Sequence, residues 1–160
     1  SEIAAFCAPQ WQAVVETVIE KQIRYYRQKR QGQQKVNQLL RGLFLFYCQG
    51  LTQTEIAQQL GLNNQSAVSR LLKLSELYPD ISRNMLDYLT KSVSEFAYAR
   101  RSPDKLHDLE QRVAQFLQPH VEQLVNQAKK EGFNSQSRSM ECQVSQTICN
   151  YVQTKRGSYD

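Results

Sequence analysis

Apolar side chains recur at every third or fourth position along most of the chain, and this spacing constrains the fold more than any other feature. It is the spacing of one face of an α-helix. Only six glycines and four prolines interrupt the 160 residues, whereas glutamine, a good helix former, occurs 22 times. The hydrophobic fraction of 41% is enough to bury a core. The sequence therefore predicts an all-α protein of one domain, or of one domain with an appendage.

Residues 1–78 are expected to form a helical domain that begins with two helices. The first runs from Pro9, a residue favoured in the first turn of a helix, to about Arg30. Gly32 separates it from a second helix over about 34–47. Apolar residues dominate this second helix, so we expect it to be largely buried.

The rest of the chain is predicted to be helical as well. Residues 79–132 form a helical hairpin, with one helix starting after Pro79 and the other at Pro103. Its apolar faces could close a monomer core or form the seam of a homodimer. Residues 133–160 comprise a polar loop and an amphipathic helix over about 139–154, and docking of this helix on the body is favoured over partner binding.

The stretch "GLTQTEIAQQLGLNNQSAVSRLLKL", residues 50–74, predicts two short helices joined by a turn. Thr52 with Glu55 three residues later forms a capping box, which marks a helix start. Gly61 suits the left-handed conformation that ends a helix. The pattern therefore predicts a very short helix closed at both ends by its own sequence.

The second helix of this stretch has one apolar and one polar face. Asn63 or Asn64 can cap its start, and Val68, Leu71 and Leu72 are expected to point inward. The side chains expected to point outward are Gln65, Ser66, Ser69, Arg70 and Lys73. A short helix, a turn with glycine and a second helix with a polar outer face are typical of the helix-turn-helix at about residues 51–77.

The segment "LLRGLFLFYCQGLTQTEIAQQLGLNNQSAVSRLLKL" resembles region 4 of sigma-70-type RNA polymerase sigma factors. The family pattern is an apolar helix, a "G-L-(S/T)-x-x-E-I-A" helix, an "L-G-(I/L)" turn, and a second helix with a valine and a basic residue. The residues that match it are Gly50, Leu51, Thr52, Glu55, Ile56, Ala57, Leu60, Gly61, Leu62, Val68 and Arg70. The spacing from Gly61 to Val68 is one residue longer than is usual in that family. The resemblance implies a helix-turn-helix core in a DNA-binding transcriptional regulator, and the apolar spacing adds flanking helices and a long C-terminal hairpin.

Positive charge is concentrated in the half of the chain that holds this segment. Residues 1–75 contain nine Lys and Arg against four Asp and Glu, whereas residues 76–160 contain eleven of each. The net charge of +5 therefore arises entirely from the first half. This asymmetry favours a polyanionic partner for that half, and double-stranded DNA is the partner that the helix-turn-helix pattern predicts.

The predicted DNA contacts fall into two classes. Arg70 is the natural reader of guanine, and Gln65 or an asparagine the natural reader of adenine. The residues predicted to lie near the bases are Asn64, Gln65, Ser66, Ser69 and Arg70. The residues predicted to contact phosphates are Arg24, Arg27, Arg30, Lys35, Thr52, Gln53 and Lys73.

An alternative interpretation is a helical protein-interaction module that does not read DNA directly. In that case the same segment would bind a partner such as RNA polymerase, and the long hairpin would be the main surface. The salt dependence of binding to random duplex DNA would distinguish the two interpretations, because a DNA reader shows it and an adaptor does not.

The sequence gives little support to an enzyme or a membrane protein. His107 and His120 lack the spacing of a local metal pair, and no phosphate-binding loop or nucleophile motif occurs, so no cofactor is expected. No apolar run approaches the ~20 residues that a membrane-spanning helix needs. The four scattered cysteines are expected to be free thiols of a reduced, cytoplasmic protein; they are Cys7, Cys48, Cys142 and Cys149.

Overall fold

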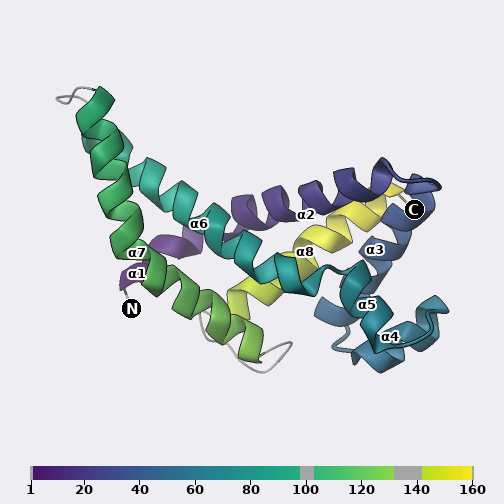
Figure 1. Ribbon diagram of the computed structural model, residues 1–160. Helices are drawn as coiled ribbons and strands as arrows, with labels where there is room; N and C mark the ends of the chain where they lie inside the picture. The colour runs from purple at the N-terminus through teal and green to yellow at the C-terminus, as the bar shows by residue number, and fades with distance from the viewer. Residues whose placement is uncertain (1, 98–102, 132–141, 160) are drawn as a thin grey trace.

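The computed structural model describes residues 2–97, 103–131 and 142–159, and these residues form helices and the short connections between them (Figure 1). The all-α prediction is confirmed. The elements are α1 (Glu2–Cys7), a 3-10 helix (Ala8–Gln10), α2 (Trp11–Arg27), α3 (Gly32–Tyr47), α4 (Gln53–Leu60), α5 (Gln65–Leu71), α6 (Leu74–Ala97), α7 (Pro103–Glu131) and α8 (Cys142–Tyr159).

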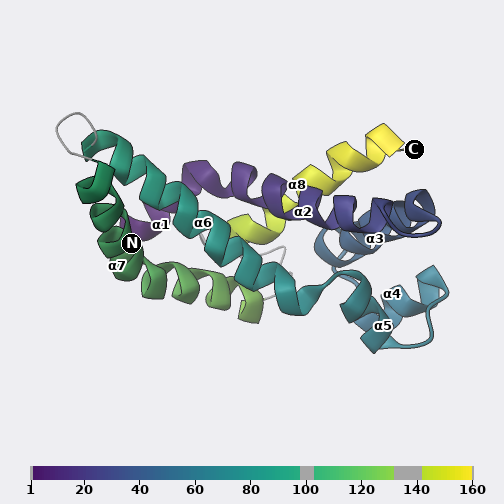
Figure 2. The ribbon, with the colours of Figure 1, turned by 45° about the horizontal axis from the view of Figure 1, so that its top comes forward.

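The helices are arranged along an elongated body. α6 and α7 pack side by side, with α1 against them at one end of the molecule (Figure 1). α2, α3 and α8 run together through the rest of the body, and α6 crosses α2. α4 and α5 project together at the end remote from α1 (Figure 2). The short helix pair is therefore attached to the body but stands out from it.

The buried apolar side chains form one continuous core. It includes residues of α2, α3, α4, α5, α6, α7 and α8, so the projecting pair shares the core of the body. Near its centre the hydroxyls of Tyr47 in α3 and Tyr78 in α6 lie 2.9 Å apart and form a buried hydrogen bond. Burial raises the pKa of both phenols, so both stay neutral and the pair ties α3 to α6 without burying a charge.

Gly42 in α3 allows the short pair to pack closely. A Cβ atom at this position would lie 3.0 Å from Leu72 Cδ2 and 3.5 Å from Leu60 Cδ1. Any residue larger than glycine at position 42 would therefore crowd the leucines that pack α4 and α5 against α3. The packing of α4 and α5 therefore depends on a small residue of α3, outside the helix pair itself.

Two predicted helix boundaries are wrong. α6 begins at Leu74 and contains Pro79, whereas the sequence predicted a start after that proline. The proline lies near the helix start, where its missing N–H affects only the carbonyl of Ser75, an exposed residue. α2 ends at Arg27 rather than near Arg30. Gly32 is the first residue of α3, and glycine is needed there because a Cβ atom would lie 2.2 Å from the carbonyl oxygen of Arg27.

α8 docks on the body, as predicted. Its apolar residues Val144, Ile148 and Val152 are buried in the common core. Tyr151 donates a short hydrogen bond to the Glu20 carboxylate of α2, and Lys155 Nζ lies 2.6 Å from the same carboxylate. Burial alone would raise the pKa of Glu20, but the hydrogen bonds from Lys155 and Tyr151 outweigh it, so the pKa lies below its ordinary value.

A disulfide joins Cys48, at the end of α3, to Cys149 in α8. The expectation of four free thiols is therefore wrong for these two residues. Their sequence separation of 101 carries no local signal, because the pair forms only when α8 packs on α3. Cys7 is a free and buried thiol, and burial raises its pKa to about 11. The side chain of Cys142 lies outside the part of the chain that the structure describes.

Candidate nucleic-acid interface

α4 is closed at its start by the predicted capping box. The Glu55 N–H donates to Thr52 Oγ1 at 3.2 Å, and the Thr52 N–H donates to Glu55 Oε1 at 3.1 Å. The hydrogen bonds from the backbone and side chain of Thr52 lower the pKa of Glu55, so the carboxylate is ionised at neutral pH. Ile56 and Ala57 are buried, and this fixes which face of α4 meets the body.

The turn between α4 and α5 has the local chemistry that the sequence predicted. Gly61 has a φ of 70°, in the left-handed region, and the Leu62 N–H donates to the Ala57 carbonyl at 2.8 Å. Asn64, rather than Asn63, caps α5, because its Oδ1 accepts a 2.9 Å hydrogen bond from the Ala67 N–H. The side chain of Asn64 is thus engaged at the helix start.

α5 presents the two faces expected from its sequence. Val68, Leu71 and Leu72 are buried in the common core. The predicted base-proximal positions that are exposed are Asn64, Gln65, Ser66 and Arg70, and Ser69 is half-buried. An unobstructed strip of polar side chains therefore runs along the outer face of a helix whose inner face is fixed.

The C-terminal end of α5 is held by α2. The Tyr26 hydroxyl donates to the Leu71 carbonyl at 2.7 Å, and Gln22 Nε2 donates to the Leu72 carbonyl at 3.1 Å. Burial raises the pKa of Tyr26 to about 12, so its proton is retained for this bond. These contacts join residues 45 and 50 positions apart, and the sequence analysis missed them because no local pattern reports them.

This attachment brings the basic end of α2 beside α5. The exposed cations of this end, here called the α2 basic cluster, are Arg24, Arg27, Lys29 and Arg30. No Asp or Glu occurs between Lys21 and Thr54, and Glu20, just before this stretch, interacts electrostatically with Arg27. At this end of α2, Tyr25 and Tyr26 lie beside Ser69 and Arg70 of α5.

Lys73 occupies a special position between α5 and α6. Its backbone has a φ of 51°, in the left-handed region, and this interrupts the helical path between α5 and α6. Its side chain is only 19% exposed. Nζ lies 3.3 Å from the centroid of the Tyr25 ring and 3.8 Å from the Glu76 carboxylate. Lys29 Nζ lies 4.6 Å from the same ring centroid. Lys29 lies within the basic stretch 24–35 that the sequence assigned to phosphate contacts, whereas Tyr25 had no predicted role.

The other predicted phosphate contacts lie on separate elements. Thr52 precedes α4 and Gln53 is its first residue, whereas Lys35 lies in the first turn of α3 and is half-buried. Thr52 is exposed, but its hydroxyl oxygen already accepts the Glu55 N–H. The described contacts place Lys73 and Lys29 around the Tyr25 ring near Arg70, whereas Arg27 interacts with Glu20, on the side of α2 that meets α8. Thr52, Gln53 and Lys35 lie on separate elements.

Among the residues that the structure describes, no three His, Cys, Asp or Glu side chains gather so as to hold a metal ion. Within the same residues, no helix combines the length and apolar character needed to cross a membrane. Comparison of the chain with models of known protein families, with curated proteins and with solved structures found no match.

Proposed function

We propose that this protein binds double-stranded DNA in a sequence-specific manner and regulates transcription, with α4 and α5 acting as a helix-turn-helix. One observation carries the proposal. The end of α2 that carries Tyr25, Tyr26 and Lys29 lies beside Ser69 and Arg70 on α5, and the hydrogen bond from Tyr26 to Leu71 holds the two helices together. A polar helix face next to a cationic surface supplies both base readout and phosphate binding.

The reading helix would be α5, with its outer face toward base edges in the major groove. Arg70 offers the planar donor pair that matches guanine, and Gln65 offers the donor and acceptor that match adenine. Ser66 and Ser69 add short hydroxyls that can contact several bases. Because Asn64 caps the helix, its contribution to readout would come through the backbone position that it fixes.

Phosphate binding would come from the exposed arginines of the α2 basic cluster. Each phosphate contact that these arginines make would release a condensed counterion from DNA. Thr52 and Gln53, at the start of α4, suit a second phosphate, since a helix N-terminus presents unpaired N–H groups and a positive dipole end. The resemblance to sigma region 4 supports the same arrangement and makes RNA polymerase a candidate second partner.

The test is the binding of labelled random-sequence duplex DNA, measured by fluorescence anisotropy at two or more salt concentrations. We expect strong binding that weakens as salt rises. Replacing Arg24, Arg27 and Arg30 by Gln should lower the salt slope by up to about 0.9 for each phosphate contact that is lost. A protein with no salt-dependent binding to any duplex would be a protein-interaction module instead.

A matched control removes three positive charges at the other end of the molecule. Lys91 lies in the second half of α6, and Lys105 and Arg112 in the first half of α7, all of them exposed. These halves of α6 and α7 lie at the end of the molecule remote from α5 (Figure 1). Their replacement by Gln changes the net charge by the same amount as the α2 substitutions. If both triple variants lose affinity equally, the effect is one of net charge, and the α2 basic cluster is not a DNA contact.

A further inference from the structure

We infer that Tyr25 gathers Lys29 and Lys73 into a clamp for one DNA backbone phosphate at the C-terminal end of α5. This inference rests on the proposed function and adds to it the role of Tyr25 and the pairing of Lys29 with Lys73. Tyr25 is a positioning residue in this scheme, and the two lysine ammoniums are the groups that contact the phosphate.

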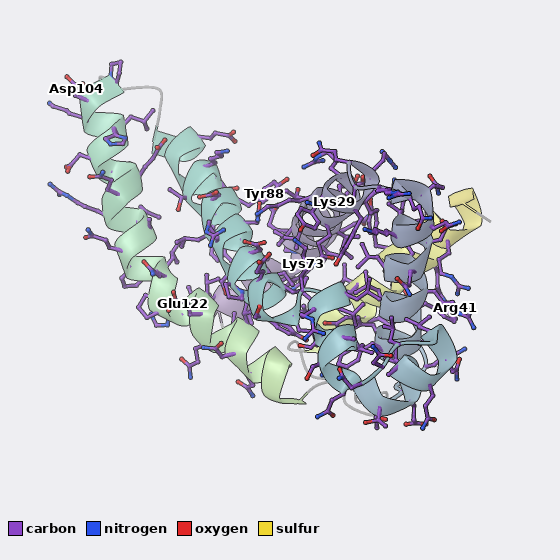
Figure 3. All side chains as sticks on the ribbon, turned by 45° about the vertical axis from the view of Figure 1, so that its right-hand side comes forward. Lys29, Arg41, Lys73, Tyr88, Asp104 and Glu122 are labelled. Carbon is purple, nitrogen blue, oxygen red and sulfur yellow. A yellow bond between two sulfur atoms is a disulfide. The ribbon has the colours of Figure 1, made fainter. Side chains whose placement is uncertain are left out.

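The location is a notch of about 300 Å³ where α2, α5 and the start of α6 meet. Its lining residues are Tyr25 and Tyr26 of α2, Ser69 and Arg70 of α5, and Lys73, Ser75 and Glu76. Figure 3 labels Lys29 and Lys73 near one another at this junction. The notch opens beside the exposed Arg70, so a DNA strand that met α5 would pass close to it.

The Tyr25 ring explains why two cations share this place. It is 43% exposed although it is a large apolar group, and both ammoniums lie close enough for a cation–π contact with its face. Their distances from one centroid put them at most about 8 Å apart, within one Debye length at physiological salt. Two cations held this close repel each other, and an anion between them would relieve that repulsion.

Glu76, the acidic residue beside Lys73, leaves room for such an anion. Within the described part of the chain, Lys73 pairs with Glu76 at 3.8 Å, which is long for a charged hydrogen bond. The Glu76 side chain is 64% exposed, so its carboxylate can turn into solvent when a phosphate approaches. A lysine ammonium has three donors, and it can therefore keep its contact with the ring while it donates to a phosphate oxygen.

The experiment compares Tyr25→Leu with Tyr25→Phe. Phenylalanine keeps the aromatic face and leucine does not, whereas both lack the hydroxyl. With random duplex DNA, we expect Tyr25→Phe to bind like the wild type. Tyr25→Leu should bind several-fold more weakly, and its salt slope should fall by up to about 1 for the lost phosphate contact. Glu76→Gln should bind more tightly than the wild type, because it removes the competing carboxylate.

Two further measurements distinguish a failure of the clamp from a failure of the proposed function and from a loss of the fold. In the free protein, the ε-methylene protons of Lys73 should show an upfield ring-current shift that Tyr25→Leu removes. Thermal unfolding should show that both Tyr25 variants are folded. If the wild type binds DNA with the expected salt slope but Tyr25→Leu retains that slope, the clamp is overturned while the proposed function stands. Equal losses in Tyr25→Phe and Tyr25→Leu would overturn it too, because the aromatic face would then be irrelevant.

Discussion

The hydroxyl of Tyr26 lies 2.7 Å from the carbonyl oxygen of Leu71 and donates a hydrogen bond to it. This contact joins a long helix of the body to the last turn of a seven-residue helix. Such a short helix has little stability of its own, so its position depends on what holds its ends. Asn64 closes one end of α5, and Tyr26 with Gln22 closes the other.

We therefore expect Tyr26→Phe to loosen α5. The substitution keeps the packed ring but leaves a partly buried carbonyl without its donor, which costs about 1–2 kcal/mol. Thermal unfolding should show a lower Tm, and specific DNA binding should weaken because α5 is less well positioned. Tyr25→Phe is the matched control on the neighbouring, exposed tyrosine. An unchanged Tm for Tyr26→Phe would mean that water replaces the hydroxyl without loss.

The local parts of this arrangement could be predicted from the sequence, and the long-range parts could not. The capping box at Thr52, the left-handed Gly61 and the inward Val68 follow from contacts within a few residues, and the structure confirms each of them. The role of Tyr26 depends on a residue 45 positions away. No periodicity or motif reports such a pairing, because it arises only when α2 packs against α5.

Charge shows the same division between local and long-range information. The excess of Lys and Arg in residues 1–75 is visible in the sequence, but its distribution over the surface is not. Packing places Lys73 under the Tyr25 ring and leaves Lys35 half-buried, although both were predicted as phosphate contacts.

Self-association also stays a prediction. Phe6 and Phe116, which are 63% and 67% exposed, mark the apolar surface on α1 and α7 where it would be sought.

Gly42 provides a test of how the short helix pair is seated. We expect Gly42→Val to destabilise the protein by about 1–3 kcal/mol, because its side chain would extend into the leucines that already lie 3.0 to 3.6 Å from a Cβ atom. Gly157→Val is the matched control, since a Cβ at that position meets nothing within 4 Å. Chemical denaturation of both variants measures the difference. Equal stability in the two would show that α4 and α5 can shift away from α3 without cost.

The disulfide between Cys48 and Cys149 should contribute strongly to stability. In the loop-entropy model, closing a loop of about 100 residues stabilises a protein by about 4–5 kcal/mol. We expect a dithiol reductant to lower the Tm of the wild type and to have no such effect on the Cys48→Ala, Cys149→Ala double variant. Mass spectrometry of a non-reduced digest should find the two cysteines in one linked peptide. Recovery of both as free thiols from oxidised protein would contradict the pairing.

Glu20 makes the docking of α8 sensitive to acid. Its folded-state pKa lies below the ordinary value of 4.5, so the stability that it contributes is present above that value and is lost as the pH falls through the lowered pKa. We expect Glu20→Gln to be less stable than the wild type at neutral pH, with the difference shrinking below about pH 4.5. Tm measurements across the acidic range check this. A difference that is independent of pH would assign the effect to packing rather than to the charge.

Arg70 is the residue on which sequence-specific binding should depend most. Its side chain is exposed on the outer face of α5, so Arg70→Ala should leave the Tm nearly unchanged. The same substitution should cost about 1–3 kcal/mol of specific binding and relax the preference at one base position. Val68→Asp should do the reverse, because it places a charge at a fully buried position and unfolds the pair. Selection of bound sequences from a random duplex library, carried out in parallel for Arg70→Ala, Ser69→Ala and Lys73→Ala, identifies the reader. If all three folded variants select the same sequences as the wild type, α5 does not read bases.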